Sequence, residues 1–248
     1  MNSIEQLRKW IEESNRIVFF GGAGVSTESK IPDFRSADGL YEKKNKYPYP
    51  AEVMLSHTFY EQHPKEFFDF YFNEMIYEDA LPNPAHYALA KLEKMGKLDA
   101  VITQNIDGLH QKAGSVNVLE LHGSVMRNYC TRCGKFFDLE QTVKLHDKDG
   151  IPRCDVDNAV IKPDVVLYEE GLDQSVVTRA VSAIASADLM IVGGTSLVVY
   201  PAAGLLQYFR GQHLVLINRD STPYDSHADL VIHEPIGKVL DEAVKGLE

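Results

Sequence analysis

The sequence predicts an α/β protein in which a parallel sheet carries helices on both faces and a smaller second lobe is attached. Three observations support this fold class. Short runs of Val, Ile, Leu and Phe lack polar alternation, which is typical of strands buried on both faces. Segments with helical spacing of apolar residues alternate with these runs. Two of the runs end in turns of small residues, Gly21-Gly22-Ala23-Gly24 and Gly193-Gly194-Thr195-Ser196.

Helices and strands are expected to alternate along most of the chain. The predicted helices cover residues 4–14, 83–95, 174–186, 201–210 and 236–247. The predicted strands cover residues 16–20, 98–103, 116–121, 165–168, 189–192, 214–217 and 230–232. Capping residues set the helix boundaries: Ser3 is the candidate N-cap of the first helix, Asn83-Pro84 starts the second, and Gly96 ends it.

Two stretches interrupt this alternation, and we interpret them as inserts that form the second lobe. Residues 31–80 are rich in aromatic residues and become helical late, with one apolar stripe made of Phe67, Phe68, Tyr71 and Met75. Residues 126–160 are polar and hold all three cysteines. The sheet domain is therefore expected to be discontinuous, comprising residues 1–30, 81–125 and 161–248.

The charge balance limits the classes of partner. The chain has 25 Lys and Arg residues against 36 Asp and Glu residues, a net charge of −11 with neutral histidine. This acidic balance argues against nucleic acid or an anionic membrane as a partner, and it is compatible with a basic peptide. No apolar run approaches the ~20 residues that cross a bilayer, and the N-terminus lacks a secretory apolar region. Three cysteines cannot pair evenly, so we expect a reducing, cytoplasmic setting.

The first glycine turn is a candidate phosphate site. Gly22, Ala23 and Gly24 follow a strand, and small residues let backbone N–H groups approach a pyrophosphate. A dinucleotide fingerprint needs a third glycine where Thr27 stands. An ordinary tight turn is therefore the alternative interpretation.

Polar side chains follow two of the predicted strands and form a second candidate site. Gln104, Asn105 and Asp107 follow one strand, and His122 follows the next. Ligands gather beyond the carboxyl ends of parallel strands, where such groups can hold ribose hydroxyls or a carboxamide. A histidine with a pKa near neutrality is the natural general base, and both His110 and His122 are candidates on chemistry alone.

Six motifs occur in one chain and in a fixed order. They read GGAGVSTESKIPDFRSADGLY, TQNIDGLHQKAG, ELHGS, KPDVVLYEE, GGTSLVVYP and LVLIN. Together they resemble the signature set of the sirtuins, the NAD-dependent protein deacylases, and the short chain resembles the bacterial members. The resemblance implies a Rossmann-like NAD-binding domain and an NAD-dependent protein lysine deacetylase. Its substrates would be proteins or peptides that contain acetyl-lysine, with NAD consumed as a co-substrate.

The resemblance also implies roles for individual residues. His122 matches the catalytic base, Asn105 assists at the ribose, and His110 lies outside the motif and is expected to be structural. Val166 and Tyr168, in the stretch 164–168 that matches the substrate strand, would flank the acyl-lysine. The expected NAD contacts are Gly22, Ala23, Gly24, Thr27, Asp33, Phe34, Arg35, Gln104, Asn105, Ile106, Asp107, His122, Gly194, Thr195, Ser196, Asn218 and Ile236.

The mechanism implied by the resemblance transfers the acetyl group to ADP-ribose. The acyl oxygen attacks the anomeric carbon as nicotinamide leaves, and His122 then helps to deprotonate a ribose hydroxyl. Protein ADP-ribosyl transfer, a nicotinamide-dependent oxidoreductase and a non-catalytic NAD-binding module are the alternatives. Family members that remove succinyl groups place a Tyr and an Arg over the acyl pocket. Tyr71 matches the Tyr, whereas Glu74 stands in place of the Arg.

The cysteines predict a metal site in the second insert. Cys130-x-x-Cys133 looks like half of a tetrahedral zinc site, and the family has a second C-x-x-C some twenty residues on. Here Cys154 is followed by Asp157 at the position of the fourth thiolate. A carboxylate can ligate zinc, so we expect a small zinc-ribbon-like module with ligands Cys130, Cys133, Cys154 and Asp157. Asp155, His146 or water as the fourth ligand, or a site that has lost its metal, are the alternatives.

Overall fold

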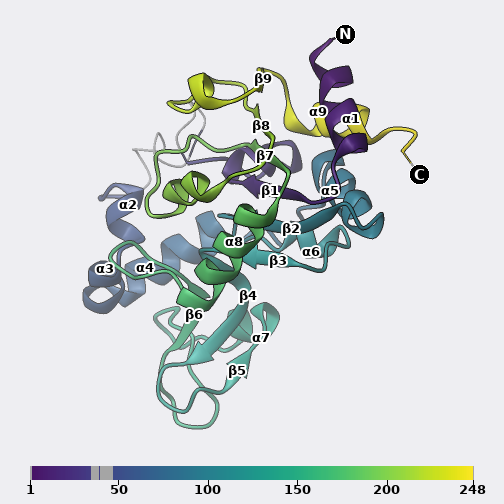
Figure 1. Ribbon diagram of the computed structural model, residues 1–248. Coiled ribbons are helices and arrows are strands. Elements are labelled where there is room, and N and C mark those ends of the chain that lie inside the picture. The colour runs from purple at the N-terminus through teal and green to yellow at the C-terminus, as the bar shows by residue number, and fades with distance from the viewer. Residues whose placement is uncertain (1, 35–38, 40–46, 248) are drawn as a thin grey trace.

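A six-stranded parallel sheet forms the centre of the protein, as seen in a computed structural model that describes residues 2–34, 39 and 47–247 (Figure 1). The strand order is β3-β2-β1-β7-β8-β9, and every neighbouring pair is parallel. Strands β1 to β3 thus form one half of the sheet, running outward from its centre. The chain then returns to the centre, and strands β7 to β9 form the other half. The strands are β1 (Ile17–Gly21), β2 (Leu98–Thr103), β3 (Val118–Glu120), β7 (Leu189–Gly193), β8 (His213–Ile217) and β9 (Leu230–Ile232).

Helices cover both faces of this sheet. One face carries α1 (Ser3–Glu13), α5 (Pro84–Lys94) and α9 (Ile236–Val244), and the other carries α8 (Gln174–Ser186) and the 3₁₀ helix η5 (Ala202–Tyr208). The helices α1 and α9 pack together, and both chain ends lie at that side of the molecule (Figure 1). Short helical turns complete this domain: η1 (Ala23–Val25), η2 (Thr27–Ser29), α6 (Leu109–Lys112) and η6 (Asp225–His227).

Strand β1 shows why the strands are apolar on both faces. Ile17 and Phe19 belong to the core beneath α1, α5 and α9, whereas Val18 and Phe20 belong to the core beneath α8 and η5. All four side chains are 0% exposed. Because successive side chains of a strand point to opposite faces, a strand between two helical layers must be apolar throughout.

The second lobe combines both inserts around a shared core. Its elements are α2 (Ala51–Met54), α3 (His57–Gln62), α4 (Pro64–Phe70), the π-helical turn η4 (Tyr71–Met75), α7 (Leu139–Lys144) and a three-stranded antiparallel sheet of order β5-β4-β6. Those strands are β4 (Gly123–Cys130), β5 (Phe136–Phe137) and β6 (Ile161–Val165). Phe67 and Phe68 of the helical insert pack in one cluster with Leu139 and Ile151 of the other. Figure 1 shows this lobe extending away from the parallel sheet.

The predicted fold class is confirmed, and several element boundaries were wrong. A strand was predicted at 165–168, whereas the observed strand β6 covers Ile161–Val165. It contains Pro163, which is tolerated because β6 is an edge strand. Strands β4 and β5 and helix α7 were not predicted. The helix expected over 201–210 is the 3₁₀ helix η5, and the N-cap of α1 is Asn2, whose side chain accepts a bond from the Glu5 N–H, rather than Ser3.

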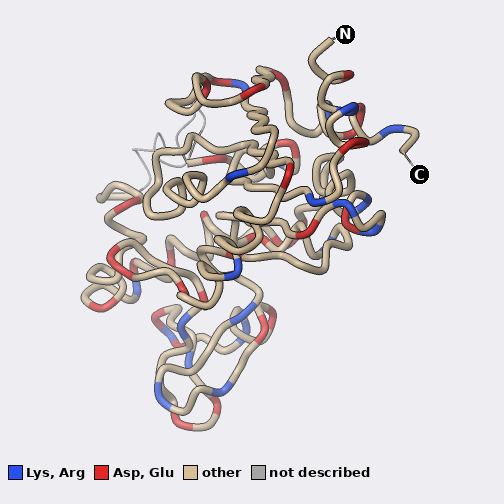
Figure 2. Tube along the Cα trace, viewed as in Figure 1, with Lys and Arg blue, Asp and Glu red and all other residues tan. Residues whose placement is uncertain are grey.

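Charged residues of both signs are interspersed along both lobes (Figure 2). None of the described helices combines the length and the apolar composition needed to cross a membrane.

Two histidines are buried together under the sheet. His86 on α5 and His110 on α6 are 0% and 1% exposed, with ring centroids 4.7 Å apart. His86 Nδ1 accepts a hydrogen bond from the backbone N–H of Asn83, but no described group bonds its Nε2 or either ring nitrogen of His110. Burial lowers the pKa of His86 to about 4 and that of His110 to about 3. Both rings are therefore neutral in the folded protein at neutral pH.

This buried pair predicts a loss of stability in mild acid. Below the unfolded-state pKa of about 6.5, the unfolded chain binds protons that the folded chain does not, so the free energy of unfolding falls as pH falls. Each histidine contributes a slope of up to about 1.4 kcal/mol per pH unit, which continues until the folded-state pKa is reached. The free energy of unfolding, measured with urea at several pH values between 7 and 5, should depend less steeply on pH for His110→Leu than for the natural chain. An unchanged slope in His110→Leu, matching that of the exposed-site control His63→Gln, would contradict this origin.

Candidate functional site

A cavity of about 1400 Å³ lies between the carboxyl edge of the parallel sheet and the second lobe. Strands β1 and β7 are neighbours at its floor, and they are the strands from which the two halves of the sheet diverge. Open α/β sheets bind ligands at such a switch point, because the connections leave in opposite directions and open a crevice. The cavity is therefore where the fold itself provides a ligand site.

The two glycine turns touch each other in this crevice. The Gly24 N–H donates to the Gly194 carbonyl oxygen at 2.8 Å. A Cβ added at Gly24 would lie 2.8 Å from the Gly194 Cα, and one added at Gly194, where φ is +59°, would lie 2.3 Å from the Val25 nitrogen. Only glycine fits at either position. Thr27, which replaces a third glycine, donates from its hydroxyl to the Gly24 carbonyl at 3.0 Å, and the chain continues in the 3₁₀ turns η1 and η2 rather than in a long helix.

A side-chain network joins the ends of three strands. Gln104 Nε2 donates to the Thr195 hydroxyl at 3.0 Å. The Thr195 N–H donates to Asn218 Oδ1 at 3.0 Å, and Asn218 Nδ2 donates to the Thr195 carbonyl at 2.7 Å. This pair of hydrogen bonds fixes the orientation of the Asn218 side chain at the edge of the cavity. Gly22, Ala23, Gly194 and Ser196 line the same region.

Ser26 joins two of the predicted polar residues. Its hydroxyl donates to Asp107 Oδ2 at 2.6 Å and accepts from Asn105 Nδ2 at 3.1 Å. Asp107 also accepts from the Leu109 N–H at 2.9 Å, and burial raises the pKa of its carboxyl group. Sequence reasoning missed Ser26, and its only signal was a hydroxyl inside a turn of small residues.

His122 is oriented as a proton acceptor. Its Nδ1–H donates to the backbone carbonyl oxygen of Gln104 at 3.0 Å, which leaves Nε2 as the basic nitrogen of the neutral ring. Burial lowers the pKa of His122, so the ring is neutral at neutral pH. His122 lines the cavity, whereas the other candidate, His110, packs in the core against Phe19 and His86.

The remaining predicted contacts line the cavity from separate segments of the chain. Asp33, Phe34 and Ile106 line it beside the second lobe, and Ile236 lines it at the start of α9. Phe34 and Ile106 also pack against the core of the second lobe. Arg35 was predicted as a phosphate contact and lies outside the described residues.

The predicted substrate strand lies beside the catalytic-base candidate. The Val166 N–H donates to the His122 carbonyl at 3.0 Å, and Tyr168 pairs with the chain at Leu55 and His57. Val166 and Tyr168 both line the cavity. Gly123, directly after His122, has φ +76°, and a Cβ there would lie 1.9 Å from the Asp164 carbonyl oxygen. His122 and the segment that contains Val166 are thus joined directly by a main-chain hydrogen bond.

The π-helical turn η4 brings Tyr71 and Glu74 to the cavity. They are 1% and 6% exposed, and both line it together with Met75. A π-helical turn inserts an extra residue into the helical repeat and is frequent at functional sites.

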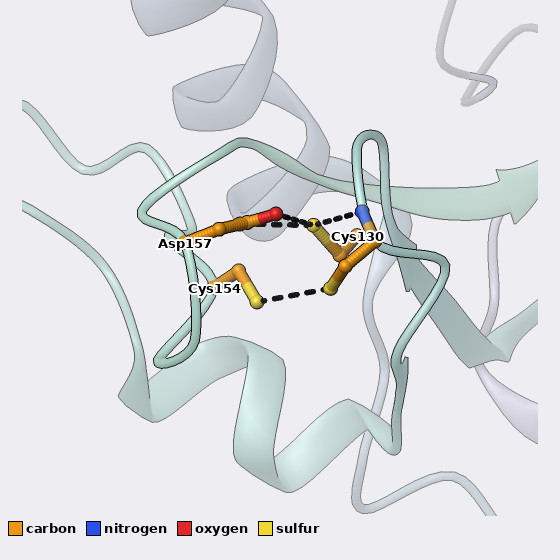
Figure 3. A group of neighbouring side chains, drawn as sticks. Cys130, Cys154 and Asp157 are labelled. Carbon is orange, nitrogen blue, oxygen red and sulfur yellow. Dashed lines mark hydrogen bonds between the residues drawn. The ribbon is translucent and has the colours of Figure 1, made fainter.

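The three cysteines and Asp157 form one cluster in the second lobe, and Figure 3 shows the side chains of Cys130, Cys154 and Asp157 pointing toward one another. One ligand atom from each lies within 4.8 Å of the others; Cys130 Sγ is 3.3 Å from Asp157 Oδ1, and Cys133 Sγ is 3.7 Å from Cys154 Sγ. Ligands of a tetrahedral zinc ion lie roughly 3.3–3.8 Å apart. The donor set fits that ion in type, and both of these distances fall within that range. Asp155 instead pairs with Lys135 at 2.7 Å.

Comparison with known proteins shows strong similarity along nearly the whole chain. A protein called NAD-dependent protein deacetylase from Clostridium acetobutylicum is 61% identical over 244 residues, which cover 98% of this chain and 99% of the relative. One of the same name from Staphylococcus aureus (strain Mu50) is 45% identical and covers 96% and 97%.

Solved structures agree with these sequence matches. One described as Sir2 with a p53 peptide and NAD⁺ has a TM-score of 0.86 and 40% identity, covering 99% of this chain and 98% of the other. One described as Sir2 bound to acetylated peptide has a TM-score of 0.87 and 38% identity, with coverage of 99% and 98%. The sequence profile described as Sir2 family matches residues 22–201. This chain therefore belongs to the Sir2 family, the sirtuins.

Proposed function

We propose that this protein is an NAD-dependent protein-lysine deacetylase that transfers the acetyl group of acetyl-lysine to ADP-ribose and releases nicotinamide. The observation that carries the proposal is the placement of His122, a neutral imidazole with a fixed tautomer, in a cavity at the switch point of a dinucleotide-binding sheet. The relatives named as NAD-dependent protein deacetylases support it along nearly the full chain.

NAD would lie across the two glycine turns. The Gly22–Gly24 turn and Thr27 would hold the phosphates, and Asn218, fixed by Thr195, would bond the adenosine ribose. Asp107 and Asn105, joined through Ser26, would bond the nicotinamide carboxamide and its ribose. When bound, NAD supplies the ADP-ribose that accepts the acyl group.

The protein contributes proton transfer and positioning. His122 Nε2 would take the proton of a ribose hydroxyl, while the Nδ1–H bond to the Gln104 carbonyl steadies the ring as it becomes charged. The acetyl-lysine peptide would pair with the extended segment 166–168, because main-chain pairing binds many sequences with little side-chain choice. Val166 and Tyr168 would flank the modified lysine.

The cluster of Cys130, Cys133, Cys154 and Asp157 would hold a structural zinc ion. It would tie the loop that follows β4 to the loop that precedes β6, remote from the NAD chemistry. The three cysteines gather as candidate metal ligands, an arrangement typical of a reducing compartment, and we propose a cytoplasmic location on that ground.

Mass spectrometry of an acetyl-lysine peptide tests the activity. The natural protein should remove the acetyl group only when NAD is present, and nicotinamide and acetylated ADP-ribose should form in equal amounts. Radiolabel from NAD that stays on protein, with no acetylated product, would instead indicate ADP-ribosyl transfer.

In the same assay, His122→Ala should reduce kcat by about 10²–10⁴-fold, the usual loss on removing a general base. NAD binding, measured by calorimetry, should be largely retained. Turnover near that of the natural protein would mean that His122 has only a structural role.

We expect acetyl-lysine to be strongly preferred over succinyl-lysine. The succinyl carboxylate would enter a cavity lined by the buried Glu74, and like charges repel strongly where water is excluded. The ratio of kcat/KM values for matched acetyl and succinyl peptides measures this preference. Glu74→Gln should reduce the ratio, whereas Glu66→Gln on the exposed side of α4 should leave it unchanged. Equal kcat/KM values for the two peptides in the natural protein would refute the prediction.

The metal prediction concerns Asp157. Purified without chelator, the natural protein should contain close to one zinc per chain, and Asp157→Cys should bind zinc more tightly because thiolate is the softer ligand. Asp157→Ala should lose affinity, whereas the neighbouring Asp155→Ala should not. Competition with a chromophoric chelator measures these affinities. Less than about 0.2 zinc per chain with full activity would show that the site has lost its metal.

A further inference from the structure

Glu28 connects the cofactor loop to the C-terminal helix. It directly follows Thr27 and lines the cavity. Its Oε1 accepts a hydrogen bond from the Gly237 N–H at 2.9 Å, a contact between residues 209 positions apart. Gly237 is the second residue of α9, so its N–H is one of the amides at the helix start that has no partner within the helix. A carboxylate there is favoured by the helix dipole as well.

The glycine at position 237 is what lets the carboxylate approach. A Cβ added there would lie 2.4 Å from Glu28 Oε2 and 2.9 Å from its Cδ. Only the end of a flexible side chain stands in the way, so a methyl group would displace Glu28 without disturbing the backbone. The contact can therefore be broken from either partner.

The same helix start forms a wall of the cofactor cavity. Ile236 is 4% exposed, and its Cδ1 lies 2.3 Å from where a Cβ of Gly193 would stand. Gly193 leads directly into the turn at Gly194 that receives Gly24. The hydrogen bond between Glu28 and Gly237 thus connects the turn at Gly22–Gly24 to Ile236, the residue expected to lie near the adenine.

Two further hydrogen bonds hold the loop at residues 25–29 from its other side. Asn83, which caps α5, donates from Nδ2 to the Val25 carbonyl at 2.7 Å and to the Ser29 hydroxyl at 3.0 Å. The chain then turns at Lys30, whose φ of +66° is unusual for a residue with a side chain. Residues 25–29 are therefore fixed between α5 and α9 before the loop departs toward Asp33.

We propose that Glu28 is a positioning residue for NAD. Its bond to Gly237 holds Thr27 and the glycine turn in register with the start of α9, so that the phosphate and adenosine ends of NAD meet a preformed site. This inference rests on the proposed NAD site and adds to it a residue that need not touch the cofactor. A residue that only stabilised the fold would lower the melting temperature without a selective effect on NAD.

Steady-state kinetics with NAD and an acetyl peptide tests the proposal. Glu28→Ala should raise KM for NAD about three- to tenfold, with KM for the peptide and kcat within about twofold of the natural values. Glu28→Gln keeps the acceptor oxygen and should restore KM for NAD to nearly the natural value. Glu242→Ala, which removes an exposed carboxylate from the same helix, is the matched control and should leave KM for NAD unchanged.

Gly237→Ala separates this role from stability. Alanine favours the helix, so the melting temperature should stay equal or rise, while KM for NAD should increase as in Glu28→Ala. The double variant should show a KM for NAD no higher than that of either single variant, because both substitutions break the same contact. An unchanged KM for NAD in Glu28→Ala, or effects that add in the double variant, would overturn the inference and leave the proposed function intact. A natural protein without NAD-dependent deacetylation would overturn both.

Discussion

The contact between two glycine turns is the constraint on which the rest of the site depends. Gly24 and Gly194 approach so closely that neither tolerates a Cβ, and a backbone hydrogen bond of 2.8 Å joins them. This contact closes the floor of the crevice where the two halves of the parallel sheet diverge. With β1 and β7 fixed in this way, the polar side chains after β2, β7 and β8 share one cavity. The chemistry of the site follows from that shared edge.

The second lobe forms the opposite wall of this crevice. Its core mixes residues of both inserts, so the helical segment and the cysteine-bearing module are packed as one unit. The parallel sheet supplies the side of the cavity where we propose that NAD binds, and the second lobe supplies Tyr71 and Glu74 on the side proposed for the acyl group. Segment 166–168, the proposed peptide-binding segment, also lines the cavity. In the proposed function, recognition of the cofactor and of the acyl group is thus divided between the parallel-sheet domain and the second lobe.

The sequence predicts this architecture where one physical effect dominates, and fails where several compete. Strands such as Ile17–Gly21 are apolar on both faces, so their pattern admits few alternatives to a covered parallel sheet. Strand β4 alternates irregularly and changes register between Ser124 and Asn128, which hides it from pattern analysis. Burial distinguishes His122 from His110, and burial is not a local property. The contact of Glu28 with Gly237 is invisible for the same reason, since nothing local relates residues so distant in the chain.

The main-chain hydrogen bond between Val166 and His122 also bears on which side chains of this sirtuin can change independently of one another. The segment 166–168, where we propose that the peptide binds, takes its register from main-chain pairing with His122, and Gly123 leaves room for that pairing. In the proposed mode of binding, side chains at 166 and 168 could therefore be exchanged to alter peptide preference without changing the distance from the modified lysine to His122. A side chain at 123 would displace both at once. If the proposed roles hold, substitutions at 166 and 168 could change peptide selectivity without moving His122, because Gly123 keeps the two segments in one main-chain register.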